Sequence, residues 1–143
     1  MSAKRKLSKT TDVNKLKEPD KVESYPVFCF KHLTTNKKYN IEYFKKKNVR
    51  EKSKAYGALF FLINDMQNSG WKDLFNRSKE IGFESIPSKQ LKLQPKNLSL
   101  PPDSKVLCIR FKKQTYRMLG IKNKDVFHVI GFDFDYSAYN HGK

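Results

Sequence analysis

The sequence has few cysteines, few acidic residues and no long apolar run, and each shortage excludes a class of protein. Its two cysteines, Cys29 and Cys108, both lie inside apolar runs. This pattern favours small core side chains in a reducing compartment over a disulfide-rich scaffold. The longest uninterrupted apolar run, residues 58–63, is far too short to cross a bilayer core of roughly 30 Å. No apolar segment follows the basic residues 4–6, so we expect no signal peptide, no membrane contact and a cytoplasmic protein.

Common catalytic motifs are missing as well. The sequence has no glycine-rich phosphate loop, no Cys/His spacing typical of zinc sites and no Gly-x-Ser-x-Gly elbow. Asp133, Asp135 and His141 carry oxygen and imidazole ligands that suit Mg²⁺ or Mn²⁺, but no second carboxylate cluster accompanies them. We therefore expect neither a metal site nor a cofactor.

Positive charge is the most prominent property of the chain. Thirty Lys and Arg residues stand against fourteen Asp and Glu, which leaves a net charge of +16 at pH 7. A solvated lysine-rich surface accounts for single lysines. The total excess favours a polyanion as partner, because such a partner relieves self-repulsion and releases counterions on binding. We expect a nucleic acid, with an acidic protein as the alternative. The candidate nucleic-acid contacts are Lys45, Lys46, Lys47, Arg50, Lys112 and Lys113.

The first 24 residues differ in composition from the rest of the chain. They are rich in Lys, Ser and Thr, carry a net charge of +3 and hold only scattered apolar side chains. Such a segment cannot offset the entropy that it loses on ordering. We therefore predict a flexible basic tail over residues 1–24 and a single domain over residues 25–143.

Changes in hydrophobic period divide the predicted domain into elements. A 3.6-residue period predicts an amphipathic helix over residues 53–70 and a shorter helix over residues 71–81. The segment 84–103 contains four prolines and is predicted to be mostly loop. Strands are predicted over residues 27–33, 105–111, 115–121 and 126–134.

This order of elements predicts the fold class. Runs of helix followed by runs of strand, without regular alternation, are typical of α+β folds. We expect an antiparallel sheet packed against two helices. The sheet would consist of one N-terminal strand and a C-terminal three-stranded meander, with a polar turn at residues 122–125.

Alternation within the meander determines where two arginines point. In the strand 105–111 the apolar side chains at odd positions share one face, so Arg110 lies on the other. In the next strand Arg117 shares its face with apolar side chains. Such an arginine either pairs with Asp133 or Asp135 on the neighbouring strand or is held in a concave face to meet an anion. Its forked donors suit phosphate better than the ammonium group of lysine does.

Two histidines lie in the last third of the chain. His128 alternates with Ile130, Phe132 and Phe134, which predicts that all four lie on one apolar face. We therefore interpret His128 as a core residue rather than a catalyst. His141 lies in a tyrosine-rich terminal segment and is either a functional residue or only part of the chain end.

The last third of the chain also carries a recognisable series of residues. The series runs through Arg110, Tyr116-Arg117, the apolar strand 126–130, and then Tyr136, Tyr139 and His141. In this series residues 109–141 resemble the C-terminal half of the RelE/ParE superfamily of toxins from toxin–antitoxin modules. One strand and two helices ahead of it are similar to the family's element order as well. The resemblance implies a RelE-like fold.

The resemblance also implies an activity, which is metal-independent cleavage of RNA, usually messenger RNA on the ribosome. An acidic antitoxin would be the natural protein partner. Carried over to this sequence, Arg117 would bind the scissile phosphate and Arg110 or Lys112 would assist it, because fixed cations stabilise the charge of the phosphorane. Tyr139 would stack on a base or orient the nucleophile. His141, which is not a family-wide feature, is the candidate proton donor or acceptor.

A competing hypothesis comes from a different class of protein. The same charge excess suits a non-enzymatic module that binds nucleic acid or a protein, such as a defence or counter-defence protein of a mobile element. The two hypotheses differ in one property. Only the enzyme cuts RNA, and only the enzyme loses that activity in the Arg117→Ala variant.

Overall fold

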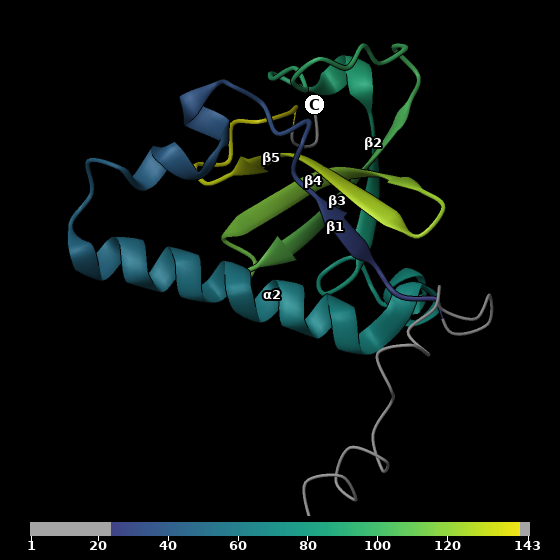
Figure 1. Cartoon of the computed structure of the whole chain (residues 1–143), viewed down its shortest axis with the longest axis horizontal. Coiled ribbons are helices and arrows are strands. Elements are labelled where there is room, and N and C mark those ends of the chain that lie inside the picture. Colours follow the sequence, from purple (N-terminus) through teal and green to yellow (C-terminus); the bar gives the residue numbers. More distant parts are fainter. Residues whose placement is uncertain (1–23, 141–143) are drawn as a thin grey trace, which may run out of the picture.

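The computed structural model describes residues 24–140, which form a five-stranded mixed sheet and one main α-helix (Figure 1). The strands are β1 (Val27–Cys29), β2 (Phe83–Pro87), β3 (Lys105–Phe111), β4 (Tyr116–Asn123) and β5 (Val126–Asp133). The helix is α2 (Val49–Asn76), and the 3₁₀ turns are η2 (Lys37–Tyr39), η3 (Ile41–Phe44) and η4 (Ser88–Gln90). The predicted tail lies outside the described residues except for Ser24. The predicted α+β class is confirmed.

The sheet has the order β1-β5-β4-β3-β2. The predicted meander is present, because β3, β4 and β5 pair in antiparallel fashion. The prediction of a wholly antiparallel sheet is wrong, since β1 pairs with β5 in parallel. The side-chain pattern of a three-residue strand carries no information on strand direction. The chain passes from β1 through α2 to β2 at the opposite edge of the sheet, and the meander then returns until β5 lies beside β1.

A strand was also missed, because β2 lies in the segment that was predicted to be loop. It pairs antiparallel with β3 and forms the edge of the sheet. The strand is only five residues long and ends at Pro87. A proline in a short apolar run argues against a strand, unless that strand lies at the edge of a sheet. The N-terminal strand is shorter than the predicted 27–33, since it ends at Cys29.

The helix α2 begins earlier than predicted and replaces two predicted helices by one. Its N-cap is Asn48, ahead of the predicted start at residue 53, and the Asn48 Oδ1 accepts the Glu51 backbone N–H at 2.8 Å. The predicted stop at Gly70 is a break in the helical backbone, with φ 81° and ψ 162°, after which the helix resumes and ends at Asn76. Trp71 N–H donates to the Ser24 carbonyl at 3.0 Å, which joins this break to the start of the described chain.

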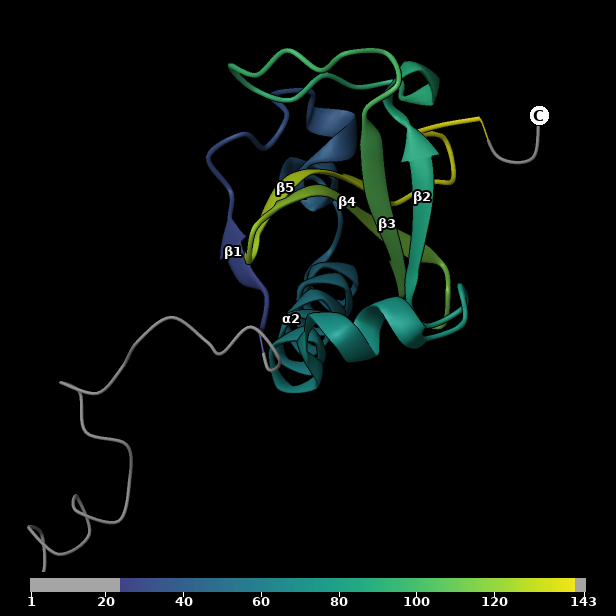
Figure 2. The ribbon, with the colours of Figure 1, turned by 90° about the vertical axis from the view of Figure 1, so that its right-hand side faces the viewer.

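The sheet separates two groups of buried side chains. On the helix side, Leu62, Met66 and Leu74 of α2 pack against the sheet residues Ile109, Met118, Phe127, Val129 and Phe132. On the far side, the sheet residues Val106, Cys108, Leu119 and Ile130 pack against Tyr39, Leu93, Ala138 and Tyr139. Figures 1 and 2 show the helix below the strands and the connection 88–104 above them. The predicted alternation in β3 is therefore confirmed, with Ile109 and Phe111 facing α2 and Cys108 facing away.

A β-bulge in β5 overturns the prediction for His128. Leu119 pairs with Gly131 and Gly120 with Val129, so Ile130 is an extra residue between them. The bulge shifts the alternation by one residue: Phe132 faces the helix, whereas Ile130 faces the far side. His128 therefore does not share one face with both. It is half-buried, and its ring lies 5.9 Å from that of His32.

The C-terminal segment crosses the far side of the sheet. Leu91 and Tyr139 form an antiparallel bridge, and the Lys92 N–H donates to the Ala138 carbonyl at 2.7 Å. The Ser137 N–H donates to Oδ1 of the buried Asp133 at 2.9 Å, which fixes the turn after β5. This segment is what places tyrosine side chains beside the arginines of β3 and β4. Across residues 24–140, no helix combines the length and the apolarity that a bilayer span requires.

Candidate functional site

Arg110 and Arg117 lie directly opposite each other on β3 and β4. Because they are cross-strand partners in an antiparallel pair, their side chains leave the same face of the sheet. That face is the far side, where the pair Cys108 and Leu119 lies two residues further along the strands. The register thus places both arginine side chains on one face of the sheet.

The two arginines line a polar cavity of about 450 Å³, which we call the arginine pocket. Other side chains that line it are Lys79, Glu84, Gln90, Tyr136, Tyr139 and Asn140. They come from the segment before β2, from β2 and η4, and from the C-terminal segment. Glu84 is the one carboxylate among the residues that line the cavity.

The internal partners of Arg110 leave donors of its guanidinium unused. Its Nη1 donates to the Gln114 Oε1 at 3.1 Å, and its Nη2 lies 3.7 Å from the Glu84 Oε1, beyond hydrogen-bond distance. The Arg110 Nε and the Glu84 Oε1 are both buried and have no hydrogen-bond partner. Arg110 and Glu84 therefore form a loose ion pair that can be opened by a ligand.

Arg117 is the most unusual group in the pocket, because it is only 5% exposed and its Nε has no hydrogen-bond partner. Within residues 24–140 no carboxylate oxygen lies within 4.0 Å of its guanidinium. Asp133 is the register partner of Arg117 on β5 and is fully buried, and its Oδ1 accepts the Ser137 N–H. Asp135 lies 3.7 Å from the Lys38 Nζ. The cross-strand placement of Asp133 beside Arg117 is therefore present, whereas no ion pair within 4.0 Å joins the two side chains. A buried cation without a counterion is costly, so this site favours an anion.

Two tyrosines of the C-terminal segment lie beside Arg117 in different environments. The Arg117 guanidinium lies over the Tyr136 ring, with its Cζ 4.9 Å from the ring centroid. Tyr136 is 59% exposed and adopts a left-handed backbone conformation with φ 64°. Tyr139 is buried, and its hydroxyl lies 3.6 Å from the Cys108 Sγ.

The environment of Tyr139 restricts its chemistry. Burial raises the pKa of Tyr139, and burial also raises the pKa of the Cys108 thiol to about 12. Both groups are therefore protonated at neutral pH and serve as hydrogen-bonding partners rather than bases. A ring as buried as that of Tyr139 offers no face to a nucleobase, whereas Tyr136 is largely exposed at the same pocket.

The structure brings together three of the four predicted catalytic residues, Arg110, Arg117 and Tyr139. His141 lies outside the described residues. The sequence does not single out Glu84 and Gln90 as parts of this cavity, because the prolines of segment 84–103 predict a loop there. The alternation of Phe83, Glu84, Ser85 and Ile86 was the signal that could have found the strand.

The six predicted nucleic-acid contacts lie elsewhere, around an aromatic cluster at one end of the sheet. Lys45, Lys46, Lys47 and Arg50 are exposed between the end of η3 and the first turn of α2, and Lys112 and Lys113 are exposed in the β3–β4 loop. The Lys47 Nζ lies 5.6 Å from the Tyr43 ring centroid and the Lys112 Nζ lies 4.9 Å from that of Tyr116. Phe44 joins the two regions, since its ring centroid lies 5.8 Å from that of Tyr116.

A second cavity, of about 880 Å³, is a groove between α2 and the β3–β4 loop. We call it the helix–hairpin groove. Its helix wall includes Phe61, Leu62 and Ile81, and its hairpin wall includes Phe111 and the loop residues Lys112, Lys113 and Gln114. All three loop residues have positive φ angles, of 50°, 52° and 68°. Arg110 lines this groove as well as the arginine pocket.

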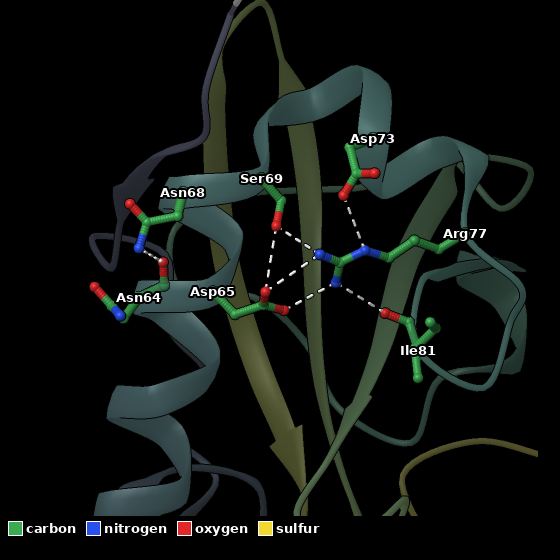
Figure 3. A network of polar contacts seen from close by, with 7 residues as sticks. All are labelled: Asn64, Asp65, Asn68, Ser69, Asp73, Arg77 and Ile81. Atoms are coloured by element: carbon green, nitrogen blue, oxygen red, sulfur yellow. Dashed lines mark hydrogen bonds and ion pairs between the residues drawn. The ribbon is translucent and has the colours of Figure 1, made fainter.

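Arg77 organises the helix wall of the groove (Figure 3). Across the break at Gly70, its Nη1 donates to the Asp65 Oδ2 at 2.8 Å and its Nη2 donates to the Ser69 Oγ, while its Nε donates to the Asp73 Oδ2 at 3.1 Å. The hydrogen bond from Arg77 lowers the pKa of Asp65, against the opposing effect of burial. One guanidinium therefore engages two carboxylates of this wall, which remains net negative because Glu80 lines it as well.

Metal ligands and known relatives give no further assignment. Among the residues that the structure describes, no group of three His, Cys, Asp or Glu side chains could hold a metal ion. Two of the three residues that the sequence offers as metal ligands, Asp133 and Asp135, lie at and just after the end of β5. The third, His141, lies outside the described residues. No protein-family model, curated protein or solved structure matches this chain. The site is therefore interpreted from its geometry.

Proposed function

We propose that the arginine pocket binds a phosphodiester of RNA and that the protein is a metal-independent endoribonuclease of toxin type. The observation that carries this proposal is the pair of neighbouring guanidiniums, of which Arg117 is buried without an ionic partner within residues 24–140. Such a pair can stabilise the extra negative charge of a pentavalent phosphorane without reorganising. The net charge of +16 would draw the polyanion to the surface.

The pocket also contains a group that can accept a proton. The Glu84 Oε1 is buried, has no hydrogen-bond partner and lies 3.7 Å from the Arg110 Nη2. In the proposed reaction this carboxylate takes the proton of a ribose 2′-hydroxyl, and the 2′-oxygen attacks the adjacent phosphorus. The bond from phosphorus to the 5′-oxygen breaks, which leaves a cyclic phosphate. The leaving 5′-oxygen takes a proton, for which His141 is the candidate donor that the sequence offers.

The order of the elements supports the resemblance to the RelE/ParE superfamily. A strand, a helix interrupted at Gly70 and an antiparallel series of strands follow one another, and the arginines lie on the face opposite the helix. We therefore include the partners that this resemblance implies, which are RNA on the ribosome and an acidic antitoxin in the cytoplasm. The excess of positive charge suits both.

The test is an RNA cleavage assay with the purified full-length chain, with and without ribosomes and in the presence of a metal chelator. We expect the wild type to cut RNA in the chelator and the Arg117→Ala variant to lose about 10²–10³-fold in rate. Lys105→Ala is the matched control, because it removes one positive charge from an exposed position of β3 outside the pocket. RNA binding without any cleavage would instead favour a non-enzymatic binding module.

A further inference from the structure

The helix–hairpin groove adjoins the arginine pocket at a single shared side chain. Arg110 lines both cavities, and the neighbouring residues Lys79 and Glu80 line one cavity each. A polynucleotide that lies in the arginine pocket and passes Arg110, near the end of β3, therefore enters the groove. The groove is also the larger space, at about 880 Å³ against about 450 Å³.

The two walls of the groove differ in chemistry. The hairpin wall presents the exposed ammonium groups of Lys112 and Lys113 next to Arg110. The helix wall presents Phe61, which is 75% exposed, and its carboxylates Asp65 and Asp73 are engaged by Arg77. One wall thus suits phosphates and the other suits the flat face of a base.

The order of the cations along the chain supports the same direction. Arg110 lies near the end of β3, Lys112 and Lys113 follow it in the β3–β4 loop, and all three line the groove. Such a series allows successive cationic contacts along a polynucleotide backbone. A positively charged track beside an exposed aromatic ring is the arrangement by which proteins hold single-stranded nucleic acid.

We propose that the helix–hairpin groove is a subsite for single-stranded RNA, in which a base next to the scissile phosphodiester stacks on Phe61 while its phosphate lies against Lys112 and Lys113. This inference rests on the function proposed above and names its substrate class. A base that stacks on Phe61 must be unpaired, so the substrate is a single strand long enough to pass from the arginine pocket into the groove.

RNA fits the groove better than a protein segment does, because the groove is continuous with the arginine pocket. The same arginine that faces the phosphodiester pocket forms part of the groove, so one strand satisfies both cavities. The helix wall carries three acidic side chains against Arg77, so it stays net negative and directs the phosphates of a bound strand to the cationic hairpin wall.

The experiment compares the binding of a 2′-O-methyl dinucleotide and a 2′-O-methyl hexanucleotide by fluorescence anisotropy. The methyl group blocks the attacking oxygen, so binding is measured without cleavage. The variants are Phe61→Ala, Phe60→Ala and Arg117→Ala. Phe60 is the matched control, because it is 70% exposed on the same helix but does not line the groove.

We expect the hexanucleotide to bind more tightly than the dinucleotide. Phe61→Ala should weaken the hexanucleotide by about 5- to 100-fold, the range that one stacked base gives, and should leave the dinucleotide unchanged. Phe60→Ala should match the wild type. Arg117→Ala should weaken both ligands.

Three results would overturn these expectations in distinguishable ways. If Phe61→Ala binds the hexanucleotide as the wild type does, or if Phe60→Ala loses as much, the groove does not hold RNA, and a protein segment becomes the better occupant. In that case the effect of Arg117→Ala on the dinucleotide still supports the pocket. If the wild type binds neither ligand, the proposed function fails together with the inference.

Discussion

Arg110 and Arg117 are register partners on β3 and β4, so the sheet holds two positive charges directly opposite each other. Like charges in this relation destabilise an antiparallel pair. Glu84 lies 3.7 Å from Arg110, and the buried Asp133 is the register partner of Arg117 on β5, while the Arg117 guanidinium lies over the ring of Tyr136. The folded protein therefore contains a local arrangement that an anion would stabilise.

The first prediction concerns the stability of the ligand-free protein. Arg117→Met should increase the free energy of unfolding by about 1–2 kcal/mol in a buffer without multivalent anions, because a buried charge is replaced by an apolar side chain of similar volume. Chemical denaturation measures this change. Lys105→Met, which removes an exposed charge of the same sign, should change the stability by less than about 0.5 kcal/mol. A destabilised Arg117→Met variant would mean that the guanidinium has a strong internal partner.

The second prediction concerns the carboxylate of the pocket. Glu84→Gln should reduce the rate of RNA cleavage by about 10²–10⁴-fold, because an amide cannot accept the proton of the 2′-hydroxyl. The same variant should bind a 2′-O-methyl dinucleotide more tightly, since it removes the negative charge beside Arg110. Single-turnover kinetics and anisotropy measure the two effects. Equal cleavage by wild type and variant would remove Glu84 from the mechanism.

The third prediction compares two glycines of α2. Gly70 has a φ of 81°, and a Cβ there would lie 3.2 Å from the Ser24 carbonyl oxygen. Gly70→Ala should therefore destabilise the fold by more than about 1 kcal/mol. Gly57 is inside the helix, and a Cβ added there would meet no atom within 4 Å, so Gly57→Ala should stabilise by about 0.5–1 kcal/mol. Thermal unfolding of both variants tests the pair, and two shifts of the same sign would contradict the break at Gly70.

The fourth prediction concerns pH. Arg77 lowers the pKa of Asp65 in the folded protein, so this carboxylate binds protons less readily when folded than when unfolded. Its contribution is present above the ordinary pKa of 3.8 and is lost as the pH falls through the lowered folded value. Asp65 is half exposed, so the contribution is below about 1 kcal/mol. Asp65→Asn should be less stable than the wild type at pH 7, and the difference should shrink below pH 3.8. A difference that grows on acidification would contradict the sign.

Sequence patterns were most informative where local alternation alone determined the answer. The alternation in β3 put Arg110 and Cys108 on the face away from α2, and the two-residue turn Lys124-Asp125 falls within the predicted polar turn. The glycine at position 70 also marked the break in the helix. Each of these features depends on neighbours within a few residues.

Features that depend on distant contacts were not predictable. The bulge at Ile130 reverses the alternation of β5, and the adjacent Gly131 marks an irregularity there without showing which residue is the extra one. The strand β2 exists because Phe83 and Ile86 find partners on β3, and the parallel pairing of β1 follows from the long connection. Glu84 was missed for the same reason, since its place in the pocket comes from β2.

The measurement that tests the phosphodiester pocket most directly is nuclear magnetic resonance of the arginine side chains. Both the Arg110 and the Arg117 Nε–H groups are buried without hydrogen-bond partners, so each should give a resonance that reports on a bound anion. We predict that a 2′-O-methyl dinucleotide shifts both resonances together and in a saturable way. A titration that moves only signals of surface lysines and leaves both Nε–H resonances unchanged would contradict the account.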